Sequence, residues 1–457
     1  MNRFSRRAML KLMGLGAAST AWAACAPSAT PEPAAPVGDQ EMTLSFWWPG
    51  CDAECEPAFV NNWTAKYTAQ HPNVKFQMAG PPWDEYWTKL PLNIAGGSGP
   101  DLYFFHTNWS QQFVDSGLIE AWPEAAVPEI KQLVDHVDTN VINGKLYFYD
   151  TGLGTDSVFY NQEMWQAAGL TEADIPKSWA QLVEIAKELT VYDAAGEVER
   201  AGFNWLHDDV RWTWVMLKYQ HGEFLFSQDG RRALFNTEGA RSAAQMILDW
   251  EFKDKIGSSN LPGSLDSFAS GLTATVFGGG WMADWLDTNH PEIEYGVFVL
   301  PTLDGQLPPA YDAAFGGGSP GVNPQAAPER KQVAFDFIRA ATTDPELMTA
   351  VAMGGYAPVL KSIQSDPAVI GHPMVKAQLD QIERCIYYGT PPPAWENTLN
   401  VFTDPVLTAF TGDMDQALAE AQQAADEALS EPDTVYWGFQ ERLYAHAGEM
   451  HEPALMA

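Results

Sequence analysis

Tryptophan is the most informative residue type in this sequence, because many of its 18 copies follow predicted strands and stand beside Gly, Pro or Asn. A tryptophan in a hydrophobic core more often lies within a periodic apolar run. An indole ring at a strand end can stack on the flat C–H face of a sugar, while Asp, Asn, Glu or Arg side chains pair with the sugar hydroxyls. A buried hydroxyl needs a partner, so these polar side chains would set specificity.

Two groups of such residues follow predicted strands in the N-terminal part of the chain. Trp48 ends the first strand, and His106, Asn108 and Trp109 come directly after the third strand. Open α/β sheets bind ligands in the crevice at the carboxyl ends of their strands. Trp281 has the strongest claim, because it follows three glycines at the end of a later strand. All five are candidates for ligand contact, with core packing as the alternative for the three tryptophans.

The elements that must position these side chains begin with a β-α-β-α-β pattern. The apolar periodicity predicts strands at residues 42–48, 74–78 and 101–105, with helices at 58–70 and within 81–99. This order implies a parallel sheet with right-handed crossovers. Further along the chain we expect helices at 179–189, 212–219, 238–252, 331–341, 345–354 and 413–429, and strands at 272–277 and 295–301.

The stretch 143–190 is predicted to carry the chain from one lobe into another. Its two short strands, 146–149 and 158–160, are joined by a segment with two glycines and no large polar side chain. Asn161 and Ser178 occupy N-cap positions of the two helices that follow. We interpret the stretch as a crossing beside a ligand cleft, with an ordinary strand–loop–strand–helix unit as the alternative.

Several phrases of the sequence together resemble one protein family. They are G-P-D-L-Y-F-F at 99–105, G-K-L-Y-F-Y at 144–149, P-K-S-W-A-Q-L at 176–182 and F-A-S-G-L-T-A-T-V-F-G-G-G-W at 268–281. In wording and order they resemble the extracellular solute-binding proteins of sugar-importing ABC transporters, the family that includes the maltose-binding protein. The resemblance runs over residues 42–430, from the first strand to the last helices.

This resemblance implies a two-lobed α/β fold of the type II periplasmic-binding-protein kind, in which each lobe is a mostly parallel sheet flanked by helices. Residues 41–152 and 317–355 would form the first lobe, and residues 153–316 and 356–445 the second. Three hinge crossings would lie near residues 152–155, 316–318 and 356–358. The chain after the third crossing is expected to be helical to about residue 443.

The resemblance also adds site residues. Trp281 aligns with a tryptophan that stacks on the sugar in that family, and Trp83 with Asp84 stands in a contact loop of the first lobe. The other residues that this likeness places near the cleft are Arg211, Trp212, Gly317, Tyr356 and Trp395. Core packing remains the alternative for five of the tryptophans, Trp48, Trp83, Trp109, Trp212 and Trp395. The implied function is capture of a neutral mono- or oligosaccharide by a monomer that delivers it to permease subunits, without catalysis or a cofactor.

The N-terminus predicts export and anchoring. Residues 5–11 form a twin-arginine pattern, followed by an apolar run too short to span a membrane and by two alanines before Cys25. We expect residues 1–24 to be a signal that is removed, Cys25 to become the lipidated first residue, and the Pro/Ala-rich residues 25–40 to act as a flexible tether. Simple cleavage with an unmodified Cys25 is the alternative. The protein would then face the periplasm or the cell exterior and touch the membrane only through this lipid.

The net charge of −33 argues against two classes of partner. Nucleic acid and anionic membrane surfaces both repel so acidic a chain. An anionic ligand is also disfavoured, because the candidate loops offer mainly Arg211 as a basic group. A solvated, soluble surface is the plainest cause of the acidity.

Cysteines and catalytic motifs add little to this interpretation. Cys51 and Cys55 could close a small disulfide loop in an exported chain, and pairing with Cys385 is the alternative. The sequence has no G-x-S-x-G motif of a serine hydrolase, and no P-loop lysine follows its triple glycine. It also has no H-E-x-x-H motif, so a metal site is not expected. A polysaccharide lyase or glycosidase, and a binding protein for a peptide or polyol phosphate, are the alternative functions.

Overall fold

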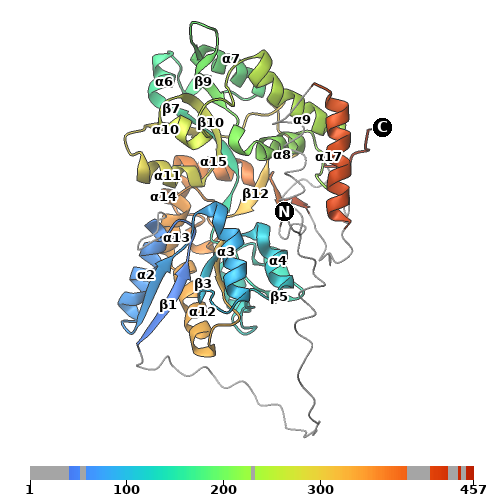
Figure 1. Cartoon of the computed structure of the whole chain (residues 1–457). Coiled ribbons are helices and arrows are strands. Elements are labelled where there is room, and N and C mark those ends of the chain that lie inside the picture. Colours follow the sequence, from blue (N-terminus) through green and yellow to red (C-terminus); the bar gives the residue numbers. More distant parts are fainter. Residues whose placement is uncertain are drawn as a thin grey trace. The chain divides into compact units, whose positions relative to one another are not determined.

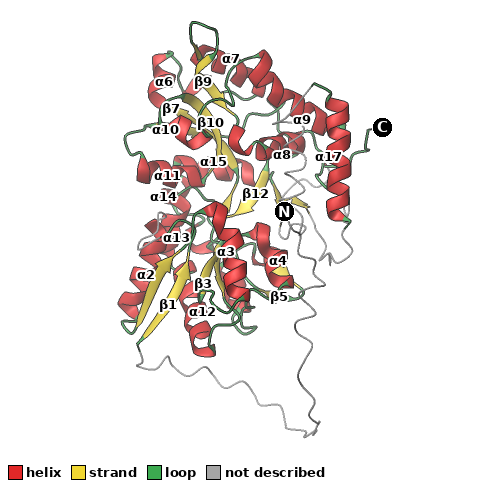
Figure 2. Cartoon of the chain, viewed as in Figure 1, coloured by secondary structure: helices red, strands yellow, loops and turns green. Residues whose placement is uncertain are grey.

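The computed structural model describes residues 41–51, 58–227, 232–388, 412–430, 441–443 and 449–456. These belong to one compact unit, Gln40–Ala457. Helices and strands alternate through most of it, and the strands gather into three main sheets (Figures 1 and 2). Two of these sheets carry separate hydrophobic cores and define what we call the first and second lobes.

The sheet of the first lobe confirms the predicted parallel unit. Its strand order is β13-β3-β1-β2, in which β1 is parallel to both β2 and β3, and β13 joins the edge antiparallel to β3. The strands are β1 (Met42–Trp47), β2 (Val74–Ala79), β3 (Leu102–Phe105) and β13 (Ser319–Val322). The main helices of this lobe are α2 (Ala58–Gln70), α3 (Trp83–Ala95), α12 (Pro328–Thr342) and α13 (Pro345–Met353).

A charged network ties the first lobe together at the start of β3. The guanidinium of Arg330 on α12 donates two hydrogen bonds to Asp101, at 2.6 and 2.5 Å. The backbone N–H and hydroxyl of Ser45 on β1 donate to the same carboxylate, each at 2.8 Å. Burial opposes ionisation of Asp101, but these hydrogen bonds outweigh it and hold the pKa of Asp101 below its usual value.

The sheet of the second lobe is mixed rather than mostly parallel. Its order is β11-β7-β10-β9-β8, and β9 with β10 is its parallel pair. The difference arises at β7, which pairs antiparallel with both of its neighbours, β10 and β11. The strands are β7 (Asp156–Asn161), β8 (Val191–Tyr192), β9 (Val198–Asn204), β10 (Thr273–Gly279) and β11 (Tyr295–Phe298).

Helices of the second lobe begin largely where the sequence predicts. The side chain of Asn161 caps α6 by accepting the N–H of Met164, and Ser178 forms a capping box with Gln181 on α7. The helices are α6 (Gln162–Ala167), α7 (Trp179–Leu189), α8 (Arg211–Gln220), α9 (Glu238–Leu248), α10 (Ser264–Ala269), α11 (Trp281–Asn289), α15 (Pro373–Ile382) and α17 (Met414–Leu429).

A third sheet joins the crossings, and it corrects one prediction. Its order is β15-β14-β12-β6, made of β6 (Leu153–Gly154), β12 (Ala313–Gly316), β14 (Ile386–Tyr388) and β15 (Glu441–Leu443). The expectation that the chain stays helical to about residue 443 is therefore wrong, because β14 finds its hydrogen-bonding partner in the distant β12. The strand expected at 146–149 is also displaced: β5 is Lys145–Leu146, paired with β4 (Val141–Ile142) in a tight hairpin.

The three predicted crossings lie against one another. Leu153 and Ala357 exchange two backbone hydrogen bonds, at 3.0 and 2.7 Å. The N–H of Gly317 donates to the carbonyl of Gly152 at 2.7 Å. Figure 1 shows β12, which begins the second crossing, between the labelled elements of the two lobes. This hydrogen bonding places the pivot of any motion between the lobes at β6, β12 and residue 357.

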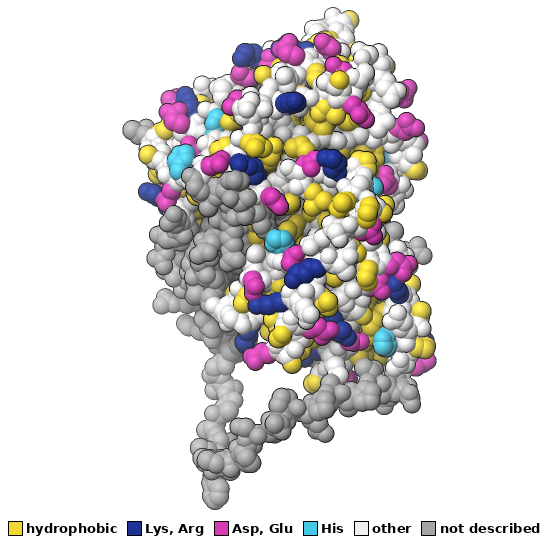
Figure 3. Space-filling model, turned by 180° about the vertical axis from the view of Figure 1, so that it is seen from behind, with side chains coloured by type: hydrophobic (Ala, Val, Ile, Leu, Met, Phe, Trp, Pro, Cys, Tyr) yellow, Lys and Arg dark blue, Asp and Glu magenta, His cyan; other side chains and the backbone are white. Residues whose placement is uncertain are grey.

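Surface charge and cysteine state agree with the sequence where the structure describes them. Acidic side chains are spread over the visible face among lysines and arginines, as a solvated surface requires (Figure 3). Cys51 is disulfide-bonded and Cys385 is a buried free thiol, so Cys385 does not take part in that bond. The structure does not describe Cys55, nor the N-terminal signal, Cys25 and the tether. None of the described helices has the length and apolar character of a membrane span.

Candidate functional site

The carboxyl edge of the first-lobe sheet carries an exposed tryptophan. Trp83 follows β2 and begins α3, and 49% of its surface is exposed. Its ring lies 6.0 Å from that of His106 and 5.9 Å from that of Phe104, at the end of β3. The side chain of Asp84, predicted to act with Trp83, lies outside the described part of the chain. Trp83 therefore offers a free ring face where the sequence predicts ligand contact.

Trp87 packs between Trp83 and Trp109 at this edge of the sheet, although the sequence did not single it out. It stacks on Trp109 with the ring centroids 5.1 Å apart and the planes inclined by 10°, and it meets Trp83 edge-on at 5.3 Å. Only 8% of Trp87 is exposed, and its Nε1–H finds no acceptor within the described residues. The spacing W-x-x-x-W on one helix was the signal for this pair, because residues four apart share a helix face.

His106 and Asn108 form the polar part of the same edge. The Nδ1 of His106 accepts the backbone N–H of Asn108 at 3.3 Å and caps the short helix η1 (Thr107–Trp109). Burial lowers the pKa of His106 to about 4, so its imidazole is neutral at physiological pH. This edge therefore offers aromatic faces and neutral hydrogen-bonding groups rather than positive charge.

Trp48, in contrast, packs inside the first lobe. It is 5% exposed and meets Phe46, Phe59 and Trp63 edge-on, with ring centroids 5.8 to 6.3 Å apart. The sequence left core packing open for this residue, and its burial favours that role. Its position after β1 does not bring it to the surface because α2 covers it with Phe59 and Trp63.

Arg211 and Trp212 begin α8, after the carboxyl end of β9. The Nε of Arg211 lies 2.6 Å from a carboxylate oxygen of Asp209, and its guanidinium lies 5.5 Å from the centre of the Trp212 ring. Both side chains are partly buried. The charge of Arg211 is thus balanced by Asp209, which leaves little positive charge for an anionic ligand.

Trp281 is the exposed aromatic of the second lobe. It directly follows β10 and Gly280, begins α11, and is 40% exposed. A Cβ atom on Gly279 would lie 2.4 Å from Nε1 of Trp281 and 3.2 Å from Oδ1 of Asp156, so the two side chains lie side by side over this glycine. Trp281 therefore lies partly exposed directly after a strand, and its contact with a ligand stays a prediction.

Gly317 and Tyr356 lie together at the crossings, as the sequence predicts. The ring of Tyr356 covers Gly317 and Gly152, since added Cβ atoms there would lie 3.2 and 2.6 Å from Tyr356 atoms. Burial raises the pKa of Tyr356, so its phenol stays neutral. On the far side, the backbones of Gly280 and Gly355 touch, and a Cβ atom on Gly280 would lie 1.8 Å from the Gly355 carbonyl oxygen.

These contacts connect the two edges through the crossings. Phe104 at the first-lobe edge packs on Gly318, and the neighbouring Gly317 lies against Tyr356. Gly355, which precedes Tyr356 in the sequence, contacts Gly280, and Gly280 directly precedes Trp281. The exposed rings of Trp83 and Trp281 therefore lie on different lobes, with Gly317 and Tyr356 at the crossings that connect them. Trp395, the remaining predicted contact, lies outside the described residues.

A pair of carboxyl groups that the sequence analysis did not identify lies beside the second-lobe group. Asp312 is 2% exposed and accepts the N–H of Asp156 at 3.0 Å and the hydroxyl of Thr155 at 3.1 Å. The two carboxyl groups also hydrogen-bond each other, and burial with their mutual repulsion raises the pKa of Asp156 well above normal. No sequence spacing pointed to this pair, because its members stand 156 residues apart.

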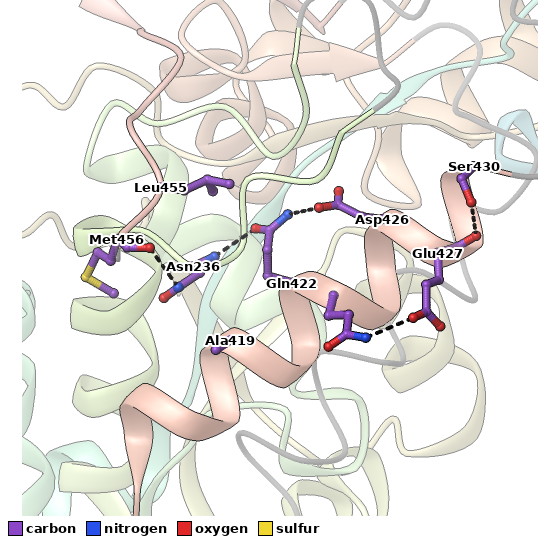
Figure 4. Close-up of a pocket in the computed structure, with 9 residues that line it drawn as sticks. Asn236, Ala419, Gln422, Asp426, Glu427, Ser430, Leu455 and Met456 are labelled. Atoms are coloured by element: carbon purple, nitrogen blue, oxygen red, sulfur yellow. Dashed lines mark hydrogen bonds between the residues drawn. The ribbon is translucent and has the colours of Figure 1, made fainter.

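Two surface pockets lie away from these residues. One, of about 490 Å³, is formed by α17 and the C-terminal segment, where Gln422 holds the backbone of Asn236 and the side chain of Asp426 (Figure 4). The other, of about 690 Å³, lies between α7 and α9. Neither includes a predicted site residue. Within the described part of the chain, no group of three or more His, Cys, Asp or Glu side chains is arranged to hold a metal ion.

Comparison with known protein families and sequences gives a consistent result. Residues 62–377 match the model of bacterial extracellular solute-binding proteins. The chain is 24% identical over 321 residues to the maltotriose-binding protein of Pyrococcus abyssi, covering 68% of this chain and 65% of that protein. It is 24% identical over 277 residues to a binding protein of Brucella abortus, covering 58% and 64%. The match thus spans a little under two thirds of the length of these relatives.

Solved structures show the same fold. The maltose/maltodextrin-binding domain of Bdellovibrio bacteriovorus, bound to maltotriose, superposes with a TM-score of 0.71 at 20% identity over 85% of this chain and 100% of its own. A solute-binding protein of Thermotoga lettingae, bound to α-D-tagatose, gives a TM-score of 0.72 at 19% identity over 85% and 100%. This likeness shows the type II periplasmic-binding-protein fold expected from the sequence.

Proposed function

Because this chain belongs to the family of bacterial extracellular solute-binding proteins, we propose that it is the sugar-binding component of an ABC importer. It captures a neutral mono- or oligosaccharide between its lobes and delivers it to the permease subunits. It acts as a monomer, without catalysis and without a cofactor. Similar proteins bind maltotriose and α-D-tagatose, so both belong among the first ligands to test.

One observation carries this proposal: each lobe presents a partly exposed tryptophan after a strand of its own sheet, next to neutral polar groups. Trp83 offers its ring beside the uncharged His106, and Trp281 offers its ring beside Asp156. Rings of this kind stack on sugar faces while polar groups pair with hydroxyls. The balanced charge of Arg211 supports a neutral ligand over an anionic one.

The carboxyl pair does not support the glycosidase alternative. The two acids of a glycosidase stand about 5–9.5 Å apart so that a glycosidic bond fits between them. Asp156 and Asp312 instead hydrogen-bond each other directly. Asp312 is also almost fully buried and accepts from Thr155 and from the backbone of Asp156, so it is not placed to act on a substrate as a catalytic acid or nucleophile.

Calorimetric titration with neutral saccharides tests the proposal. The panel contains maltose, maltotriose, mannobiose, mannotriose and α-D-tagatose, with a uronic acid, a polyol phosphate and a peptide as competing classes. We expect at least one neutral sugar to bind in the micromolar range or tighter, about −8 kcal/mol or better. Binding of anions or peptides alone would reject a sugar ligand.

Export through the twin-arginine signal and anchoring through a lipidated Cys25 are part of the same proposal. A solute-binding protein must stay close to its permease, and a lipid on Cys25 with the following tether would achieve this. Changing Cys25→Ser should release the protein from the membrane fraction or block its processing. Recovery of wild-type protein as a soluble chain with another N-terminus would refute the anchor without affecting the sugar site.

A further inference from the structure

The carboxyl pair of Asp156 and Asp312 lies where the first crossing enters the second lobe. Asp156 begins β7, directly after the pivot strand β6, and Asp312 directly precedes β12. Asp312 is almost fully buried, whereas Asp156 stays partly exposed. The pair thus has an inner member enclosed by the protein and an outer member that keeps part of its surface exposed.

Burial, neighbouring charges and hydrogen bonds together favour a proton on Asp156 and an ionised Asp312. Asp312 accepts from the hydroxyl of Thr155 and from the backbone N–H groups of Asp156 and Ala313, all of which stabilise its ionised form. The influences on Asp156 are burial, the charges of Asp312 and Asp209, and the hydrogen bond that it makes to Asp312, and each of them favours its neutral form. Asp156 is therefore an uncharged acid that donates its proton to the carboxylate of Asp312.

The outer carboxyl group also lies beside the exposed ring of the second lobe. Oδ1 of Asp156 and Nε1 of Trp281 lie over the same glycine, Gly279. Gly279 leaves room for both because it has no side chain. A sugar that stacks on Trp281 would therefore bring a ring hydroxyl next to this carboxyl group.

We propose that Asp156 is a ligand-binding and specificity-determining residue: its uncharged carboxyl group, held by the carboxylate of Asp312, accepts a hydrogen bond from a hydroxyl of the sugar on Trp281. This inference rests on the proposed function. An uncharged acceptor pairs with a hydroxyl without the cost of desolvating a free carboxylate. The negative charge behind it disfavours ligands that carry a carboxylate or phosphate at this position.

The surroundings of the pair predict how binding depends on pH. Asp209 on η4 (His207–Asp209) faces Asp156 with its charge balanced by Arg211, and the thiol of Cys385 adjoins Asp312. Burial raises the pKa of Cys385 well above its ordinary value, so this thiol stays protonated. The sugar prefers the protonated pair, so its affinity should be highest at low pH and should fall as rising pH removes the shared proton.

The test measures binding of maltotriose, or of the panel member that binds most tightly, at pH 6 and pH 9. We expect the wild-type Kd to rise at least about tenfold between the two pH values. A tenfold change is what results when ligand binding raises the pKa of the shared proton by one unit. Asp156→Asn keeps an uncharged acceptor that can still donate to Asp312, and it should bind within about threefold of wild type at pH 6 with no loss at pH 9. Asp156→Ala removes the acceptor and should weaken binding about tenfold at pH 6.

Two controls separate this role from a general effect of charge or folding. Asp266→Asn removes one negative charge from an exposed position on α10 and should keep the wild-type pH dependence. Thermal unfolding of Asp156→Asn, which is almost isosteric, shows whether the fold survives. Equal affinity of wild type at both pH values, or unchanged binding by Asp156→Ala, overturns the inference alone. Failure of every saccharide at both pH values overturns the proposed function and this inference with it.

Discussion

Replacing Trp281 by alanine tests whether the exposed ring of the second lobe binds the ligand. Trp281 lies at the first position of α11, where its backbone is fixed by β10 before it and by the helix after it. Its ring contributes little to any core, because 40% of the residue is exposed. The substitution should therefore affect binding much more than folding.

The expected loss follows from the area that a sugar would cover. A tryptophan side chain presents up to ~250 Å² of surface, so the exposed share corresponds to ~100 Å² of ring. Covering this area at ~25 cal/mol per Å² is worth about 2.5 kcal/mol, and its loss should raise Kd roughly 50- to 100-fold. Trp281→Phe should retain about half of this free energy, because a smaller ring still stacks.

Isothermal titration with the tightest-binding saccharide measures this effect, and thermal unfolding of the same sample checks the fold. Phe252 offers a matched control, since it is an aromatic residue of the second lobe that is 66% exposed and lies outside the predicted site. Phe252→Ala should leave Kd unchanged. Normal binding by Trp281→Ala, or a large loss of stability in this variant, would place the ring in a packing role and refute the reasoning.

Three further predictions concern stability and motion. The free energy of unfolding should fall as pH is lowered below about 4 and through the depressed pKa of Asp101, because Arg330 and Ser45 favour the ionised form of Asp101 in the folded state alone. Urea titrations at several pH values should show that the free energy of unfolding depends less on pH in Asp101→Asn than in the wild type. Gly355→Ala should lower the free energy of unfolding by at least ~1–3 kcal/mol, since Gly355 has a φ of +109° and an added Cβ would lie 2.0 Å from the carbonyl oxygen of Gly280; an unchanged urea midpoint would contradict this contact. Saturating ligand should reduce the radius of gyration in small-angle X-ray scattering, because only the closed form lets both lobes contact the sugar; an unchanged radius with confirmed binding would indicate a rigid site.

Local features of the fold could be predicted from the sequence because their determinants lie close together along the chain. Asn161 and Ser178 cap helices through contacts with residues three positions away, and both caps are present. The β-α-β-α-β unit of the first lobe likewise follows from apolar periodicity and short connections. Trp281 was identified by its position directly after a strand, which needs no knowledge of distant partners.

Features that depend on distant partners could not be predicted in the same way. β14 is a strand because it pairs with β12, some seventy residues earlier, and its own three residues carry no distinctive pattern. Trp48 stands at a strand end like Trp281, yet helix α2 covers it with Phe59 and Trp63. Whether a ring at a strand end is free or buried is therefore decided by tertiary packing.

The pivot of the two lobes can be located more closely than the sequence allowed, because buried glutamines fix the chain on one side of it. Gln378 on α15 accepts the N–H of Thr155 at 2.7 Å, and Gln381 on the same helix donates to the carbonyl of Asp156 at 2.6 Å. Both glutamines are almost fully buried, so these bonds bind the chain from residue 155 onward firmly to the second lobe. On the other side, Thr151 donates its N–H and hydroxyl to the carbonyl of Gly318 in the chain that enters β13.

Only residues 152–154 of the first crossing then remain between the two anchored segments. Two of these three residues are glycines, which tolerate large changes of φ and ψ. Asp156 lies two positions beyond this pivot and moves with the second lobe, together with Trp281. Closure would therefore carry the ring and the uncharged acid as one rigid unit toward Trp83, so that stacking and hydroxyl recognition are completed in the same step.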